Sequence, residues 1–359
     1  MKLWTNSRAY RWRDCKYRHH LEYVDGWRPK KQTEALHMGI LFHLGLEKWW
    51  GVLMLSQQEP EAFTDTFGED PLLKVMLVQA LGAVAGKAWD ESQQVRVEEM
   101  LIAYHQRWKG AVDDYEVLSV EQTWTAPMVN PESGRASRTW MLGGKWDVIA
   151  RHRGQERTVI IEHKSCDEEI DTTTADYWLK LRMDNQISQY YVGAQGLGHE
   201  IDGCLYDVCR RPRSRPKAIK QVRKKKSETD AEFAARKEVE GRLENAEEFR
   251  ARVRADFAER PDYYLQRMYV DRTQADLNLF AWDTWEESKI AHNAETAGRA
   301  PRNPSSCLTF GQCPFWEHCS AGVELEQNDR FEKIPNPHPE LDQGVVVGVL
   351  EGPDQEDGE

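Results

Sequence analysis

Two strand-like runs at the centre of the chain constrain its fold more than any other feature. Residues 139–152 and 157–165 are rich in apolar and β-branched side chains, and the polar residues 153–156 separate them. Such runs joined by a short polar loop predict a β-hairpin. Pairing outward from the loop sets residue 152 opposite 157 and residue 147 opposite 162. We therefore expect Asp147 and Glu162 to lie side by side, with Cβ atoms about 4.5–5.5 Å apart.

Lys164 joins this pair, because residues two apart on a strand point to the same face. Two adjacent carboxylates repel each other, and a divalent cation such as Mg²⁺ relieves that repulsion. Such an ion can orient a phosphate and activate a water, while Lys164 offsets developing negative charge. The alternative is an incidental acid pair beside a solvated lysine. Glu162 directly follows the apolar run 159–161, and a charge ending a buried strand needs a partner, which favours the metal site.

The rest of the chain mixes helical and strand patterns, which predicts an α/β fold with a mixed central sheet flanked by helices. Helices are expected at residues 6–24, 33–56, 72–86, 91–109, 176–196 and 274–296, and further strands from about 116, 203 and 262. We divide the chain into a helical part (1–115), a core (116–210), a basic and helical insertion (211–260), a return to the core with a cysteine-bearing segment (261–320), and an acidic tail (321–359) that we expect to be disordered.

Charge is distributed unevenly along the chain. The formal net charge is -12, yet residues 210–226 carry ten Lys or Arg and no acid, and residues 321–359 carry eleven acids against two bases. A basic run of this kind either follows a DNA backbone or is a solvated, mobile loop. The candidate DNA-binding residues are Arg210, Arg211, Arg213, Arg215, Lys217, Lys220, Arg223, Lys224, Lys225 and Lys226.

Two shorter motifs flank the hairpin: residues 39–43, which begin with Gly39 and end with His43, and residues 186–190, which begin with Gln186 and end with Tyr190. Together with the G-x-x-D of residues 144–147 and the E-x-K of residues 162–164, they resemble the motifs of the RecB-like branch of the PD-(D/E)XK nuclease superfamily, in the same order. That branch includes helicase-linked, phage and CRISPR-adaptation exonucleases. The resemblance covers residues 6–320 and implies a restriction-endonuclease-like core.

The resemblance also implies roles for individual residues. It implies that His43, Asp147, Glu162 and a main-chain carbonyl near His163 hold Mg²⁺ or Mn²⁺. Lys164 would assist the attacking water, and Gln186 and Tyr190 would orient the site or touch DNA. Taken alone, a helical histidine is more often structural, and a Gln and Tyr four apart on one helix face can simply support each other. Glu121, which ends an apolar run before the hairpin, is a weaker additional candidate.

Some of the seven cysteines form a second candidate metal site. Cys307, Cys313 and Cys319 form a C-x5-C-x5-C run in an irregular segment, which suits a zinc ion or an iron–sulfur cluster but lacks a fourth ligand. The resemblance supplies Cys15 as that ligand and implies a 4Fe–4S cluster joining the two ends of the domain. Its usual first spacing is C-x2-C rather than C-x5-C, so zinc remains an alternative, as do reduced buried thiols. We expect Cys166, Cys204 and Cys209 to be core thiols.

The predicted function is metal-dependent hydrolysis of DNA. By resemblance, we expect an exonuclease that acts on single-stranded or end-resected DNA in repair, recombination, phage replication or CRISPR adaptation, with a helicase or a recombination or CRISPR-adaptation protein as a partner. The alternative is a non-catalytic DNA-binding or assembly subunit that retains the fold. The sequence contains no membrane-span-length apolar run and does not begin like a signal peptide, so we expect a cytoplasmic location.

Overall fold

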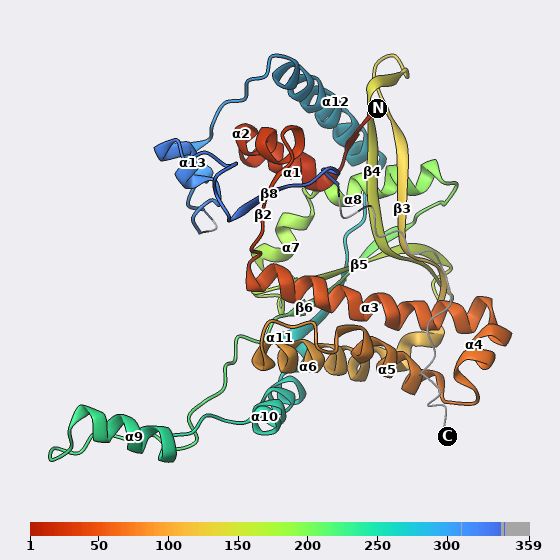
Figure 1. Ribbon diagram of the computed structural model, residues 1–359. Helices are drawn as coiled ribbons and strands as arrows, with labels where there is room; N and C mark the ends of the chain where they lie inside the picture. The colour runs from red at the N-terminus through yellow and green to blue at the C-terminus, as the bar shows by residue number, and fades with distance from the viewer. Residues whose placement is uncertain (310, 339–340, 342–359) are drawn as a thin grey trace, which may run out of the picture.

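A mixed β-sheet forms the centre of the molecule, as the alternating pattern predicts. The computed structural model describes residues 1–309, 311–338 and 341. The sheet runs in the order β1-β4-β5-β6-β7, and β3 pairs with β4 on its other side (Figure 1). Its strands are β1 (Lys2–Trp4), β3 (Tyr115–Val129), β4 (Ala136–His152), β5 (Arg157–Cys166), β6 (Gly203–Arg210) and β7 (Leu265–Tyr269). The β1–β4 and β5–β6 pairs are parallel, and the others are antiparallel.

The predicted hairpin register is confirmed over most of its length. His152 pairs with Arg157 across the four-residue loop, and the ladder continues to Val148 opposite Ile161. Antiparallel pairing here follows from the short connection, which allows no crossover. The ladder ends one step before residues 147 and 162, so the site lies where the two strands stop pairing. Beyond that point β4 continues and pairs with β1 instead.

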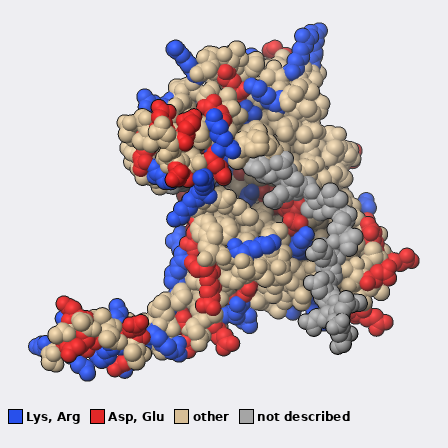
Figure 2. Space-filling view, in the orientation of Figure 1, with Lys and Arg blue, Asp and Glu red and all other residues tan. Residues whose placement is uncertain are grey.

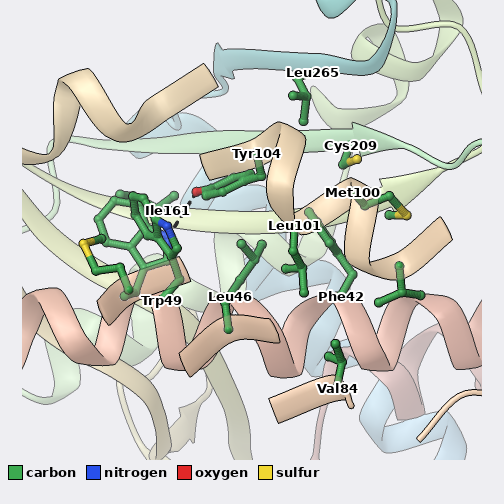
Figure 3. Packing of buried hydrophobic residues seen from close by; sticks show 14 of the residues in the cluster. Phe42, Leu46, Trp49, Val84, Met100, Leu101, Tyr104, Ile161, Cys209 and Leu265 are labelled. Atoms are coloured by element: carbon green, nitrogen blue, oxygen red, sulfur yellow. Dashed lines mark hydrogen bonds between the residues drawn. The ribbon is translucent and has the colours of Figure 1, made fainter. Parts of the chain in front are cut away.

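Helices cover both faces of the sheet, and each face has its own core. On one face lie α3 (Glu34–Gln58), α5 (Leu72–Val84), α6 (Glu91–Trp108) and α10 (Ala246–Glu259). Figure 3 shows Phe42, Leu46 and Trp49 of α3 packed in this core with Leu101 and Tyr104 of α6. On the other face lie α1 (Asn6–Asp14), α7 (Asp176–Leu181), α8 (Asn185–Gly196) and α12 (Gln274–Thr296). Burial of a core on both faces explains the near-continuous apolar runs in β5 and β6.

Helix α3 begins where the sequence predicts. The Thr33 side chain accepts a hydrogen bond from the Leu36 N–H, and Glu34 follows in the first turn, so both the cap and the helix dipole favour this start. Helix α4 (Pro60–Phe67) was not expected. It has proline at its first position and no fully buried residue. Its apolar signal is limited to Phe63 and Phe67, which pack partly buried against the core, and a pattern this short is easily missed.

The expected helix at residues 6–24 is broken at Cys15, which is a correction to the sequence-based prediction. Cys15 has extended backbone angles, and the chain continues as α2 (Lys16–His19) and a π-helical turn, η1 (His20–Val24). This segment packs against the C-terminal elements η3 (Pro304–Ser306) and α13 (Trp316–Ala321), and β2 (Trp27–Pro29) pairs with β8 (Phe331–Lys333). The two ends of the described chain therefore form one small lobe (Figure 1).

The insertion after β6 contains two helices with different surroundings. Helix α9 (Asp230–Glu240) has no buried residue and stands away from the body (Figure 1). Helix α10 instead buries Phe249, Val253 and Phe257 and packs against α6. The connecting elements are η2 (Lys109–Asp114), between α6 and β3, and α11 (Pro261–Tyr264), before β7. Of the acidic tail expected to be disordered at 321–359, residues 321–338 and 341 are described, and β8 within them pairs with β2. The other residues of this tail lie outside the described residues. No described helix combines the length and apolar composition that crossing a membrane requires.

Candidate active site

His43, Glu121 and Asp147 converge at the point where the hairpin stops pairing. One ligand atom from each lies within 4.8 Å of those of the other two. The His43 Nδ1 lies 3.5 Å from one Asp147 carboxylate oxygen, and the other oxygen accepts a hydrogen bond of 2.7 Å from the His163 main-chain N–H. Two buried carboxylates and an imidazole therefore share a space that one cation could occupy.

The backbone of β3 and β4 explains why Glu121 and Asp147 share this space. Glu121 has φ of 51° within β3, a left-handed conformation that costs a non-glycine residue on the order of 1–3 kcal/mol. On β4, Trp146 packs in the core of one sheet face and Val148 in the core of the other, although residues two apart normally share a face. Both strands therefore change faces at this level. Such strain concentrates at functional sites.

Glu162 lies near this group and is held by other partners. One of its oxygens accepts hydrogen bonds from Lys164 Nζ and from the Gln186 side-chain amide, the latter at 2.8 Å. The same amide donates to the Tyr190 hydroxyl at 2.6 Å. The second oxygen of Glu162 is buried and has no hydrogen-bond partner among the described residues. Because an unsatisfied buried carboxylate oxygen is costly, it marks a position for a missing ligand.

The start of α8 places Gln186 in contact with Glu162. Asp184 caps this helix by accepting a hydrogen bond from the Gln186 N–H, and Gln186 and Tyr190 then follow one turn apart. The expected contact of these two side chains with each other is present. Gln186 also contacts Glu162 of the E-x-K strand, which sequence spacing alone does not reveal. Lys145 forms an ion pair with Glu121, so each glutamate of the site has its own lysine.

The ionisable groups in this pocket shift one another's pKa values. Burial and the nearby Asp147 charge raise the pKa of Glu162 to about 7 and the pKa of Glu121 to about 7. Burial opposes ionisation of Asp147 as well, but the nearby His43 outweighs this effect and lowers the pKa of Asp147. Burial also disfavours a charged Lys164, but Glu162 and Asp147 raise its pKa. The pocket thus retains protons at neutral pH that a bound cation would displace.

The side chain of His163 is not one of the three converging ligands, although its ring centroid lies 6.4 Å from that of His43. It follows Glu162 on β5 and therefore points to the opposite face of the sheet, where its ring packs near Trp50 and Tyr104. Its Nδ1 lies 3.6 Å from a carboxylate oxygen of Asp207, which is 1% exposed. The main-chain N–H of His163 contacts Asp147, and the expected contribution of its carbonyl stays a prediction.

Asp207 is a buried charge that the sequence analysis did not single out. It accepts hydrogen bonds from Arg267 and from the Tyr104 hydroxyl, both at 2.7 Å. Burial opposes its ionisation, but Arg267 and His163 lower its pKa to about 2. A sequence signal was present, because Asp207 interrupts the apolar run 203–209 and a charge inside a buried strand needs partners. This network supports the sheet behind the site.

The four cysteines of the predicted cluster line one cavity of about 230 Å³ in the small lobe. Burial raises the pKa of Cys319 to about 11, and Cys313, Cys15 and Cys307 add to the effect. The guanidinium groups of Arg18 and Arg302 line the same cavity. The folded chain therefore brings Cys15 to the C-x5-C-x5-C run. Cys166, Cys204 and Cys209 are buried in the core, as expected for core thiols.

The predicted DNA-binding residues lie in a groove beside α3, on the α9 arm, and along the chain between these two places. Arg211, Arg213 and Arg215 line a groove with the start of α3. Lys220 and Lys224 lie on the α9 arm and pair there with Glu240 and Asp230. The remaining candidates follow the chain between these positions: Arg210 at the end of β6, Lys217 beside the Ala218–Leu243 bridge, and Arg223, Lys225 and Lys226 before α9.

Comparison with known proteins identifies the fold. No curated protein sequence matches the chain. The family model of the PD-(D/E)XK nuclease superfamily matches residues 4–320, a range that includes strands β3 to β7, the convergent carboxylates and the residues of the cysteine-lined cavity. The predicted α/β fold with a mixed central sheet flanked by helices is confirmed. The chain belongs to the PD-(D/E)XK nuclease superfamily.

Proposed function

We propose that this protein is a Mg²⁺- or Mn²⁺-dependent deoxyribonuclease whose active site contains His43, Asp147, Glu162 and Lys164. The observation that carries the proposal is the convergence of His43, Glu121 and Asp147 within 4.8 Å, beside a buried Glu162 oxygen that has no partner among the described residues. Oxygen and imidazole donors of this kind suit Mg²⁺ or Mn²⁺. The residues present therefore fit the ion that the superfamily uses.

Each residue has a distinct part in this proposal. His43 and Asp147 would hold the ion, with Glu162 and the His163 main-chain carbonyl completing its shell. Glu121 is added to the ligands expected from the sequence, because it lies in the same group. When bound, the ion orients the scissile phosphate and activates a water. Lys164, whose charge Glu162 and Asp147 sustain, offsets negative charge that develops on the phosphate.

Gln186 and Tyr190 act as positioning residues. The Gln186 amide binds both Glu162 and Tyr190, which holds one oxygen of the Glu162 carboxylate in place and leaves the second without a hydrogen-bond partner among the described residues. By resemblance to the RecB-like branch, we propose exonucleolytic cleavage of single-stranded or end-resected DNA in the cytoplasm, with a helicase or a recombination or CRISPR-adaptation protein as a partner.

Labelled single- and double-stranded DNA incubated with the protein and Mg²⁺ or Mn²⁺ tests this proposal. Asp147→Asn keeps an acceptor for the His163 N–H but removes the charge, and Lys164→Ala removes the ammonium group. Each should lower the cleavage rate by at least about 100-fold, and EDTA should stop cleavage. Lys289→Ala is the control, since Lys289 is exposed on α12 and pairs only with Glu286 among the described residues. Parent protein that binds DNA without cutting it would instead indicate a non-catalytic subunit.

We further propose that Cys15, Cys307, Cys313 and Cys319 hold a 4Fe–4S cluster. Tetrahedral zinc with Zn–S bonds of about 2.3 Å needs sulfurs about 3.8 Å apart. No three of these sulfurs lie within 4.8 Å of one another in the described chain, although all four line one cavity. This wider arrangement favours a cluster over a single zinc ion.

Iron and sulfide analysis of the purified protein tests the cluster. We expect about four iron atoms per chain and visible absorption that Cys307→Ser removes together with part of the thermal stability. Cys204→Ser is the matched control, since Cys204 lies in the β6 core and does not line the cavity. Zinc in place of iron would overturn the cluster but leave the nuclease proposal intact.

A further inference from the structure

Trp89 is a large aromatic side chain that is both exposed and rigidly held. It lies in the loop between α5 and α6, and 49% of it is exposed. Its ring stacks on His37 of α3, with centroids 4.6 Å apart and planes inclined by 8°. Because His37 covers one face of the indole, the exposed surface belongs to its other face and its edges. That surface is apolar, flat and open to solvent.

Gln93 of α6 holds the His37 ring and the Trp89 main chain in this arrangement. Its side chain is fully buried, and its amide oxygen accepts a hydrogen bond of 2.8 Å from the Trp89 main-chain N–H. The same oxygen lies 2.9 Å from His37 Nδ1, so Nδ1 donates this bond. An exposed tryptophan usually loses rotamer freedom when a ligand binds. Here the stacking on His37 already restricts the Trp89 side chain before any ligand binds. A preorganised ring of this kind binds a flat partner at low entropic cost.

Arginines line the groove next to this stack. The groove is about 230 Å³ and contains the guanidinium groups of Arg96, Arg211, Arg213 and Arg215 against the carboxylates of Glu34 and Asp167. Its lining is therefore net positive. Arg213 donates to the main-chain oxygen of Asp167 and has no carboxylate partner among the described residues, so its charge is available to a phosphate. In Figure 2 Lys and Arg side chains gather along the left edge of the face, near the position of the start of α3 in Figure 1.

The stack and the groove are continuous. Glu34 and the nearby Asp90 carboxylate, which directly follows Trp89, both attract the Arg215 guanidinium and raise its pKa. Gln93, which holds the stack, and Arg96, which lines the groove, lie one turn apart on α6. His37 and Glu34 have the same relation on α3. One surface thus presents a flat ring and several phosphate-binding groups.

This surface also adjoins the proposed active site. Arg211 donates to the main-chain oxygen of Ser165 at 2.7 Å and to its hydroxyl at 3.1 Å, and Ser165 directly follows Lys164. Gly39 of α3 approaches the same hydroxyl closely. His37 precedes His43 by six residues, which is about 9 Å along the helix axis. A strand whose phosphate lies at the metal site can therefore extend over the arginines toward Trp89.

We propose that Trp89, backed by His37, is a base-stacking platform for the single-stranded part of a DNA substrate, and that Arg211, Arg213 and Arg215 bind the phosphates between this platform and the active site. The inference rests on the proposed nuclease function and names its substrate as an unpaired strand. Bases in a duplex stack on each other and offer no free face, whereas an unpaired base can stack on an aromatic ring.

Binding of fluorescent oligo-dT of about 12 nucleotides, measured by anisotropy in EDTA so that no cleavage occurs, tests the platform. The comparison ligand is a phosphodeoxyribose strand of equal length without bases. Trp89→Ala should weaken oligo-dT binding by about tenfold and leave binding of the abasic strand unchanged. Trp89→Phe keeps a ring and should recover most of the loss. Trp282→Ala is the control, because Trp282 is 40% exposed on α12 and lies outside the groove.

Arg213→Ala should weaken binding of both strands equally and reduce the slope of log affinity against log salt by about one. The platform is overturned if Trp89→Ala binds oligo-dT like the parent, or if it loses affinity for both strands alike, which a structural role alone would produce. Cleavage separates the two proposals. A parent that binds oligo-dT through Trp89 but never cuts DNA contradicts the nuclease proposal alone. A parent that cuts DNA while Trp89→Ala binds unchanged contradicts the platform alone.

Discussion

At the scale of single residues, the hairpin shows what a sequence pattern can and cannot predict. The loop and the strand alternation correctly predict the pairing from His152–Arg157 onward. They do not predict the positive φ of Glu121, because nothing in the local pattern distinguishes this glutamate from one with ordinary strand geometry. That conformation makes Glu121 part of the group with His43 and Asp147, while Glu162 is held slightly apart by Lys164 and Gln186.

Glu121 gives the first residue-scale prediction. Glu121→Gln keeps the shape of the side chain and removes a charge from the proposed ion site, so the Mg²⁺ concentration needed for half-maximal cleavage should rise by about 10- to 100-fold. Cleavage rate against Mg²⁺ concentration measures this shift. Glu132→Gln is the control, because Glu132 is exposed in the β3–β4 turn. Unchanged Mg²⁺ dependence in Glu121→Gln would remove Glu121 from the proposed site.

At the scale of elements, the long helices are predicted well and the short ones are not. Helix α3 begins at a threonine cap and carries an apolar face over many turns, and both signals are local. Helix α4 has only Phe63 and Phe67 partly buried against the core, and the break at Cys15 follows from packing of the two chain ends against each other. Such features depend on tertiary contacts between segments distant in sequence, which local propensity does not encode.

The insertion between β6 and β7 allows a prediction about how much the α9 arm contributes to stability. Ala218 and Leu243 form a β-bridge at the base of the α9 arm, so their backbones are close enough for a short Gly-Ser linker. Replacing residues 219–242 by such a linker should leave the unfolding midpoint nearly unchanged, because α9 buries no residue.

Phe249→Ala in α10 is the contrasting variant. Phe249 is 1% exposed in the first core, so this variant should lose about 3–5 kcal/mol of unfolding free energy. Urea denaturation of both variants measures the difference. Substantial destabilisation by the linker replacement would show that the arm packs on the body in solution.

At the scale of the whole molecule, the family match and the sheet agree with the fold expected from alternating patterns. Two whole-molecule features could not be derived from them. The parallel pairing of β1 with the far half of β4 and the convergence of Cys15 with the three distant cysteines both join segments separated by more than a hundred residues. Only the resemblance to known nucleases anticipated the second. Both features tie the N-terminal segment to the rest of the chain. Interactions inside this segment should therefore contribute to the unfolding free energy of the whole protein.

His19 makes that stability dependent on pH. Its ring is 1% exposed, and its Nε2 accepts a hydrogen bond of 3.1 Å from Arg8 Nε, which requires the neutral imidazole. Burial, with the Arg8 charge as the next cause, lowers its pKa to about 3, against about 6.5 in an unfolded chain. Between these values the unfolded chain binds the extra proton. The contribution of His19 is therefore complete above pH 6.5 and is lost as the pH falls toward 3.

Glu121 and Glu162, whose pKa values are raised to about 7, favour the folded chain as the pH falls and so oppose the His19 effect. We therefore compare slopes: from pH 7 to pH 4 the unfolding free energy of His19→Gln should fall less, or rise more, than that of the parent. Glutamine provides an oxygen that can accept from Arg8 but does not titrate, so the variant has no proton to gain on unfolding at this position. His292→Gln on the exposed surface of α12 should follow the parent curve. Urea unfolding at several pH values gives each slope. If the pH curves of His19→Gln and the parent run parallel, His19 does not contribute to the pH dependence. Asp207, whose pKa is lowered to about 2, acts only in more acidic solution.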